Sequence, residues 1–333
     1  MMQPYSKRSR APVAPRRMDE LENWRLGHHW AFADEAKPGS DPIYHYTDVR
    51  GALGILKSGR FWFTERAHLN DPGEVNHCIE LVRQALESLK HQEGDALRKA
   101  FSEVYASEHK KSVYYIASFT DQQDDLGQWR SYADDGRGVV LGFSYAALKE
   151  FPSCSRATKQ FHAWRGGYKV KYSNSDLKTK FPEIIQEAAK RCAQRNQPPI
   201  VAPLHPVPPE AVALELFRIA QFAGFMNKHQ AYKPEQETRF LYWCDAGMTL
   251  DKHSHDGNPC IHCDVRERNG ELVQYLDVPI PEWKKRGTLT HIRLGPSSAV
   301  GLEDQLRQLC EQLGIPEPVI EKSDIPYRST RSS

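Results

Sequence analysis

The chain of 333 residues is 39% hydrophobic and 26% charged, with a formal net charge of +2 at pH 7. This length and composition are typical of a soluble globular protein with a sizeable core. No apolar run approaches the about 20 residues needed to span a bilayer, and the basic N-terminus lacks the apolar segment of a signal peptide. Seven scattered cysteines favour reduced thiols, so we expect a cytoplasmic protein without membrane contact.

The first 40 residues are expected to form a basic, proline-containing arm. Residues 1–18 carry five basic side chains and no acidic one. This composition favours a disordered tail over an arm that binds nucleic acid. Residues 19–36, which include Trp24 and Trp30, have the character of a short helix that docks on the body of the protein.

Residues 43–74 form the unit around which the rest of the chain is organised. A short aromatic strand is expected at residues 43–46. The helix that follows has Thr47 as its N-cap and Gly59 in the position of a C-terminal glycine. A second strand is expected at residues 61–64.

The remaining elements follow from periodicity and turn signals. Further strands are expected at residues 113–119, 138–143, 166–173, 238–243 and 290–294, further helices at residues 75–89, 211–226 and 302–313, and a short helical turn at residues 124–132. The dipeptide Asn269-Gly270 predicts a hairpin between residues 260–268 and 271–279. A proline-rich insertion is expected around residues 195–210, and a flexible tail at residues 321–333. Strands and helices do not alternate regularly, so the expected fold class is α+β.

Several motifs occur in order along the chain: YHYT, LNDPGE, QWRSY, KPEQETRFLYW and IRLGP. Together they resemble a large bacterial and phage family catalogued as a domain of unknown function, over roughly residues 41–315. More distantly, a histidine on the first strand, an aromatic residue in mid-chain and a glutamate on a late strand are similar to ADP-ribosyltransferases of the His-Tyr-Glu type. That resemblance implies one domain over residues 41–320, with a split mixed β-sheet, helical insertions and a site for NAD.

His45 lies between two tyrosines in the first expected strand, on the opposite face from both. A neutral imidazole there can donate a hydrogen bond to a ribose hydroxyl or an amide carbonyl. The alternative is a core histidine with a backbone partner. The resemblance implies that His45 anchors NAD, with Tyr46 and Thr47 beside it.

Residues 128–132 are placed in a loop between two buried strands, where site residues are common. Tyr132 can stack on the nicotinamide ring and Arg130 can bind the pyrophosphate, unless Tyr132 belongs to the apolar face of a helical turn. Ser118 and Thr120 are rivals for the middle position of the triad, because some transferases of this superfamily carry a Ser-x-Thr pair on the equivalent strand.

Glu235, Glu237 and Arg239 share one face if all three belong to the start of a strand. Two carboxylates there repel each other unless something uses them; the alternative is a solvated strand entry with an ordinary salt bridge from Glu237 to Arg239. By resemblance, Glu237 binds the nicotinamide ribose and stabilises an oxocarbenium-like transition state, and Glu235 positions the acceptor. His45 and Glu237 are then expected to face a common cleft, and side chains on opposite sides of the sheet would contradict the triad.

No metal site is expected. The candidates are His253, His255, Cys260, His262 and Cys263, but strand alternation separates the two cysteines and no second C-x-x-C motif exists. The chain also has no P-loop, no G-x-G-x-x-G, no H-E-x-x-H and no G-x-S-x-G motif.

The function implied by the resemblance is NAD-dependent ADP-ribosyl transfer to nucleic acid or protein. Such an enzyme would act as a bacterial toxin or anti-phage effector, with an antitoxin or another partner protein. The first alternative is an inactive ligand-sensing or nucleic-acid-binding module on the same fold, and the second is an NAD glycohydrolase. A fold-level resemblance alone does not decide among them.

Overall fold

The computed structural model describes residues 17–32, 34–35, 41–68, 73–108, 112–152, 161–163, 166–173, 175–193, 207–245, 261–268 and 270–329. The α-helices are α1 (Arg17–Phe32), α2 (Val49–Ser58), α3 (Glu74–Glu87), α4 (His91–Glu108), α5 (Leu126–Tyr132), α6 (Tyr145–Leu148), α7 (Ser175–Ala193), α8 (Pro209–Met226) and α9 (Leu302–Leu313). The strands are β1 (Asp34–Glu35), β2 (Ile43–Thr47), β3 (Arg60–Glu65), β4 (Ser112–Thr120), β5 (Val139–Phe143), β6 (Phe161–Ala163), β7 (Tyr168–Lys169), β8 (Glu237–Asp245), β9 (His262–Arg268), β10 (Glu271–Pro279), β11 (Leu289–Leu294) and β12 (Val319–Lys322). Short 3-10 helices are η1 (Arg66–His68), η2 (Asp134–Gly136) and η4 (Gln230–Glu235).

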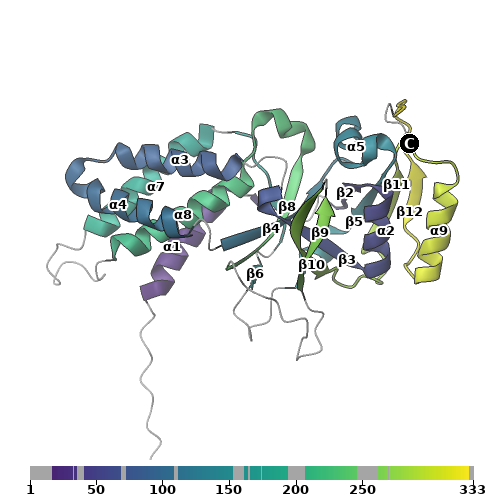
Figure 1. Cartoon of the computed structure of the whole chain (residues 1–333), viewed down its shortest axis with the longest axis horizontal. Helices are drawn as coiled ribbons and strands as arrows, with labels where there is room; N and C mark the ends of the chain where they lie inside the picture. The colour runs from purple at the N-terminus through teal and green to yellow at the C-terminus, as the bar shows by residue number, and fades with distance from the viewer. Residues whose placement is uncertain are drawn as a thin grey trace, which may run out of the picture.

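Helices α1, α3, α4, α7 and α8 form a helical layer beside one end of the sheet (Figure 1). Most of α8 is buried, as expected for a helix that is apolar on nearly every face. Trp24 of α1 is buried in this layer, so the docking helix expected near the N-terminus is present. Ile116 of β4 and Leu241 of β8 join the same core from the sheet.

The described strands form a twelve-stranded sheet in the order β1-β7-β8-β4-β2-β5-β11-β12. Off this path, β6 pairs with β8, and in a branch β3 pairs with β4 and β10, and β10 pairs with β9. The named strands pair antiparallel, except β11 and β12, which run parallel. The long central pair runs from Ser112 opposite Asp245 to Thr120 opposite Glu237. A mostly antiparallel open sheet with separate helices confirms the mixed α and β class expected from the sequence.

The sheet divides along one edge of β4. Ile116 of β4 pairs with Thr64 of β3, whereas Thr120 pairs with Tyr44 of β2. Residues 117–119 have no partner in either strand, so β2 and β3 diverge from this point. The divergence makes an opening at the centre of the molecule, between two groups of strands that are joined through β4.

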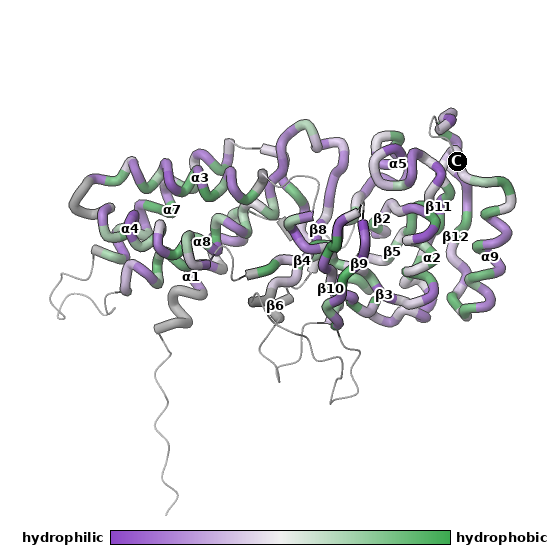
Figure 2. Tube along the Cα trace, viewed as in Figure 1, coloured by the Kyte–Doolittle hydropathy of each residue, from purple (hydrophilic) through white to green (hydrophobic). Residues whose placement is uncertain are grey.

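A second core, rich in aromatic rings, lies on the other face of the sheet. Phe61 of β3, Phe119 of β4 and Phe143 of β5 are buried in it, and helices α2 and α9 contribute to it from the outside. In Figure 2, hydrophobic and hydrophilic segments alternate along α9, because only one side of this helix faces the core. The core therefore fixes β2, β3 and β4 around the opening.

Glycines in the sequence correctly predicted the end of one helix and the turn of one hairpin. Gly59 ends α2 with a left-handed φ of 64°, and Gly270 has a φ of 82° in the turn between β9 and β10. The N-cap of α2 is Asp48 rather than Thr47: the Asp48 carboxylate accepts a hydrogen bond from Gly51 N at 2.6 Å. A carboxylate reaches the first free N–H groups of the helix from this position, and the Thr47 side chain faces the opening instead.

The expectation of a flexible tail from residue 321 is wrong for residues 321–329. Strand β12 runs to Lys322 and pairs with β11. Beyond it, the hydroxyls of Tyr327 and Ser329 each donate to the carboxylate of Asp135 at 2.7 Å. This segment is anchored because it supplies partners for a buried carboxylate.

Some sequence predictions lie outside the described residues. These are residues 1–16, residues 69–72 of the LNDPGE motif, most of the proline-rich insertion (194–206), and three metal candidates, His253, His255 and Cys260. In the part of the chain that is described, no helix combines the length and the apolar character needed to cross a membrane.

Candidate functional site

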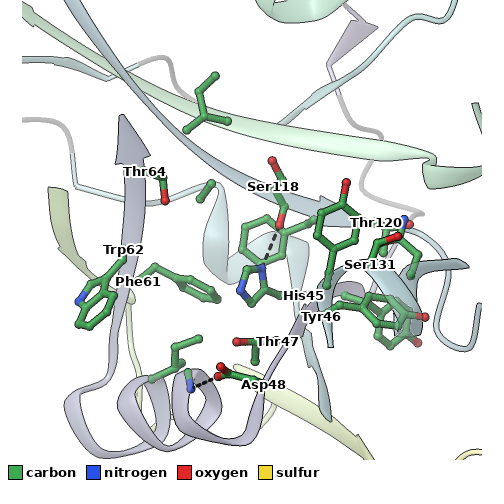
Figure 3. Close-up of a pocket in the computed structure, with 18 of the residues that line it drawn as sticks. His45, Tyr46, Thr47, Asp48, Phe61, Trp62, Thr64, Ser118, Thr120 and Ser131 are labelled. Atoms are coloured by element: carbon green, nitrogen blue, oxygen red, sulfur yellow. Dashed lines mark hydrogen bonds between the residues drawn. The ribbon is translucent and has the colours of Figure 1, made fainter. Parts of the chain in front are cut away.

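A cavity of about 690 Å³ opens where β2 and β3 diverge. Its walls come from strands β2, β3, β4, β8 and β9, from the start of α2, from α5 and η2, and from the segment around η4. Small-molecule sites in proteins typically have volumes of about 300–1,000 Å³. The division of the sheet therefore creates a space of the size of a ligand site, and Figure 3 shows part of its lining.

His45 projects from β2 into this opening. Its Nδ1 lies 3.0 Å from the carbonyl oxygen of Ser118 (Figure 3). A carbonyl only accepts, so Nδ1 carries the hydrogen and Nε2 of the neutral ring is an acceptor. Burial lowers the pKa of His45 below 6.5, the bond to Ser118 opposes this, and the charge of Arg266 lowers it further. The neutral ring therefore offers the cavity an acceptor, whereas the sequence had suggested a donor.

Glu237 lies at the start of β8 in a buried cluster of charges. Its carboxylate accepts from Nε and Nη2 of Arg239 at 2.8 and 3.0 Å, from Lys228 Nζ at 3.3 Å, and from the Ser118 hydroxyl. Burial alone raises the pKa of Glu237, but the two cations and these hydrogen bonds outweigh it and lower the pKa to about 2. The salt bridge to Arg239 exists, although it is buried rather than solvated, and Glu237 is ionised at neutral pH.

Glu235 does not lie on the strand, which corrects the expectation that it shares a strand face with Glu237. It ends η4, and Gln236 turns the chain with a φ of 42° before β8 begins. The Glu235 carboxylate accepts from Tyr132 Oη at 2.7 Å and from Lys228 Nζ at 2.6 Å. Lys228 thus bridges the two glutamates and offsets the repulsion between them.

Ser118 and Tyr132, the alternative residues for the middle position of the triad, contact different glutamates. Ser118 of β4 donates to Glu237, and Tyr132 of α5 donates to Glu235. Thr120 donates to the backbone carbonyl of Glu235 at 2.6 Å and so holds the end of η4 against β4. Both Ser118 and Tyr132 belong to one hydrogen-bonded group around the two carboxylates.

Three other predicted residues also line the cavity. The hydroxyl of Tyr46 donates to one backbone carbonyl at 3.0 Å and accepts from one backbone N–H at 2.9 Å, so its hydrogen bonds are made within the protein. Thr47 lines the cavity just before α2. The Arg130 side chain is 62% exposed and lies 3.9 Å from the Asp135 carboxylate, a loose ion pair that leaves it able to reach a ligand.

His45 and Glu237 line the same cavity but approach it from opposite faces of the sheet. Tyr44 pairs with Thr120, and Thr120 pairs with Glu237, so these three side chains share a face. His45, next to Tyr44, faces the other way and packs on Phe119 with ring centroids 5.5 Å apart. The opening at β4 is what joins the two faces.

Among the cavity residues that the sequence did not single out are Trp62, Lys228 and Arg266. Strand alternation was a usable signal for Trp62, which lies between two buried phenylalanines, and for Arg266, which shares a strand face with Arg268. Lys228 follows the apolar helix α8, and no sequence pattern showed that it would meet two distant carboxylates.

The lining of the cavity is more cationic than anionic. Its cationic residues are Arg50, Arg60, Arg130, Lys228, Arg239, Arg266 and Arg268, and its acidic residues are Asp48, Asp134, Glu235, Glu237 and Glu267. An excess of positive charge in a partly enclosed cavity favours an anionic ligand. No group of three metal-binding side chains occurs among the described residues.

The fold and the site define a mixed α and β protein whose mostly antiparallel sheet divides around a cationic cavity. Residues 128–240 match a family described as "Protein of unknown function (DUF2971)". The matched segment includes Tyr132, Glu235 and Glu237, and it supports the expected likeness to a domain of unknown function over this part of the chain. No curated protein matches the chain. No solved structure matches it.

Proposed function

We propose that this chain is an NAD-dependent ADP-ribosyltransferase. The observation that carries the proposal is the buried, ionised Glu237, which lines the same cavity as the neutral His45 at the division of the sheet. Transferases of the His-Tyr-Glu type, which the sequence resembles, use a histidine and a glutamate in this chain order around NAD. The proposal therefore rests on the site as well as on the motifs.

The residues around the cavity fit NAD chemically. Nε2 of His45 can accept a hydrogen bond from a ribose hydroxyl, and the exposed guanidinium of Arg130 can pair with the pyrophosphate. The ring of Tyr132 offers a stacking surface for nicotinamide, with Ser118 as the alternative occupant of that position. Glu237 is ionised at neutral pH, so it can accept from the 2′-hydroxyl of the nicotinamide ribose.

Transfer breaks the bond between nicotinamide and C1′ of its ribose. The bonding electron pair leaves with nicotinamide, and a lone pair of an oxygen or nitrogen on the acceptor forms the new bond to C1′, with the acceptor's proton passing to solvent. A preorganised carboxylate stabilises the positive charge that develops on the ribose, an effect commonly worth several kcal/mol. Glu237 is preorganised because Arg239 and Lys228 hold it in place.

A second candidate is a module that binds a nucleotide or nucleic acid without turnover. It is favoured by the donors that already surround Glu237: the fork of Arg239, together with Lys228 and Ser118, engages the carboxylate within the protein. His45 and Glu237 also approach the cavity from opposite faces of the sheet. In this case ligand binding would depend on the cationic side chains and would fall steeply with salt.

The test combines two assays on purified protein. Release of nicotinamide from NAD is measured first. Biotinylated NAD is then incubated with bacterial lysate, and the labelled products are divided for protease and nuclease digestion. The key variant is Glu237→Gln, which removes the charge and keeps the shape. Its matched control is Glu215→Gln, because Glu215 is also a buried carboxylate paired with an arginine, Arg218 at 2.8 Å, but lies in the helical layer.

Label that requires Glu237 but not Glu215 would support the transferase, and the digestion that removes the label would identify the acceptor class. Release of nicotinamide without label would indicate an NAD glycohydrolase. If wild type gives neither product while it still binds a nucleotide ligand, the transferase proposal fails and the binding module stands.

A further inference from the structure

One wall of the cavity carries a large aromatic ring that remains open to solvent. Trp62 of β3 is 44% exposed, although its neighbours Phe61 and Phe63 are buried. In Figure 3 the rings of Trp62 and Phe61 lie on opposite sides of the strand. Tyr275 contacts Trp62 with ring centroids 4.5 Å apart, and the tryptophan keeps its exposure despite that contact. An exposed tryptophan on a rigid strand is a stacking surface.

One arginine contacts this ring, and two more lie on the same face of the sheet. Cζ of Arg266 lies 5.3 Å from the centre of the Trp62 ring, and its Nη2 donates to Thr64 Oγ1 at 3.0 Å. The Nε of Arg266 is buried and has no hydrogen-bond partner. Arg60 lies two residues before Trp62 on β3, and Arg268 lies two residues after Arg266 on β9, so strand alternation places all these side chains on one face.

Carboxylates also lie on or beside this face. Arg60 pairs with Asp277, and Asp48 attracts Arg266 from the start of α2. Strand alternation places Asp264 and Glu271 on the same face as Arg266 and Arg268. Arg268 is exposed and donates to the backbone carbonyl of His68 at 3.4 Å. Burial and the neighbouring Arg268 lower the pKa of Arg266, and Tyr275 and Asp48 oppose this shift. An anionic group placed here would satisfy both the charge and the unpartnered Nε.

We propose that the Trp62–Arg266 face (Arg60, Trp62, Thr64, Arg266 and Arg268) binds single-stranded nucleic acid, with a base stacked on Trp62 and phosphates at the arginines. Aromatic stacking combined with a cationic groove is the recognition mode for single strands, whereas the bases of a duplex are not free to stack on a side chain. One part of this proposal rests on the proposed function: the bound nucleic acid is the acceptor of ADP-ribose, because the face borders the same cavity as Glu237.

A cationic protein acceptor suits the site less well. An arginine or lysine acceptor needs a carboxylate whose negative charge is not already offset, and Lys228 offsets the charge of Glu235, the residue expected to position the acceptor. Both of its oxygens accept from within the protein, one from Tyr132 and the other from Lys228. The Trp62–Arg266 face instead presents an aromatic ring and arginine side chains, which match a base and its phosphates.

Binding is tested without NAD, so that the result does not depend on the proposed enzymatic activity. Fluorescence anisotropy measures the affinity of the full chain for a labelled 12-nucleotide single strand, as DNA and as RNA, and for the corresponding duplex. Trp62→Leu is expected to weaken single-strand binding at least about fivefold, and Trp62→Phe to keep it within about twofold. Arg266→Ala is expected to reduce the slope of log affinity against log salt by about 0.7.

The matched control is the pair Arg83 and Tyr105 in the helical layer, where Cζ of the arginine lies 4.3 Å from the ring centre. Arg83→Ala and Tyr105→Leu remove a similar contact away from the cavity and should leave binding unchanged. Equal affinity of wild type and Trp62→Leu, or a preference for the duplex, would overturn the proposal. If only protease removes the label derived from NAD, nucleic acid is not the acceptor, whereas the proposal of transferase activity still stands.

Discussion

Replacement of Glu237 by glutamine should change the stability of the protein in a manner that depends on pH. The pKa of Glu237 is about 2 in the folded protein, against an ordinary value of 4.5. This difference corresponds to about 3 kcal/mol in favour of the folded state when the carboxylate is ionised. Glu237→Gln loses that contribution at pH 7 and also leaves the buried Arg239 without its carboxylate partner, although Lys228 keeps its ion pair with Glu235, so we expect a loss of about 3 kcal/mol or more.

The sign of the pH dependence follows from the lowered pKa. The contribution of Glu237 is complete above about pH 4.5 and disappears as the pH falls toward 2, because the unfolded chain takes up a proton first. The difference in stability between wild type and Glu237→Gln should therefore shrink by about 1 kcal/mol between pH 7 and pH 4, and by about 2 kcal/mol at pH 3.

Urea unfolding followed by circular dichroism at pH 7, 5, 4 and 3 measures this difference directly. Glu215→Gln serves as the comparison, since it removes a buried carboxylate paired with Arg218 outside the cavity. If the difference in free energy of unfolding between wild type and Glu237→Gln stays constant from pH 7 to pH 3, Glu237 is not a strongly stabilised carboxylate.

Three further predictions concern the site and its support. Because burial lowers the pKa of His45, the ring stays neutral above pH 6.5; NAD affinity measured by calorimetry should be constant from pH 6.5 to 8.5, and His45→Ala should weaken it by about 1 kcal/mol. The charge of Lys228 lowers the pKa of Glu237, so Lys228→Met should move the acidic limb of the pH profile for NAD consumption to higher pH; an unshifted limb would contradict the link. Removal of residues 323–333 deletes two hydroxyl donors to Asp135, and should lower the melting temperature and speed amide exchange in η2, with α4 as the internal reference.

The sequence predicted best those features that depend on neighbouring residues. Gly59 and Gly270 marked a helix end and a hairpin turn because a positive φ is a local requirement. The apolar character of residues 211–226 identified the buried helix α8 for a similar reason, since burial on every face leaves a continuous apolar composition. These signals need no knowledge of the rest of the fold.

The parts that were missed depend on contacts between distant segments. Glu235 was placed on a strand because its spacing from Glu237 suits strand alternation, but the left-handed turn at Gln236 separates the two. Lys228 meets both carboxylates only after η4 has folded back on β4. The tail after residue 321 has a polar composition, and its order comes from the distant Asp135.

The division of the sheet at β4 also makes the two walls of the cavity separable in design. One wall is the ribbon of β3, β10 and β9, which carries Trp62 and Arg266; in the described residues it is hydrogen-bonded to the rest of the sheet through β4 alone. The other wall includes β2, whose pairing with β5 is independent of that ribbon. A graft that exchanges the outward side chains of the ribbon can therefore give the scaffold a new specificity while His45 and Glu237 keep their backbone supports.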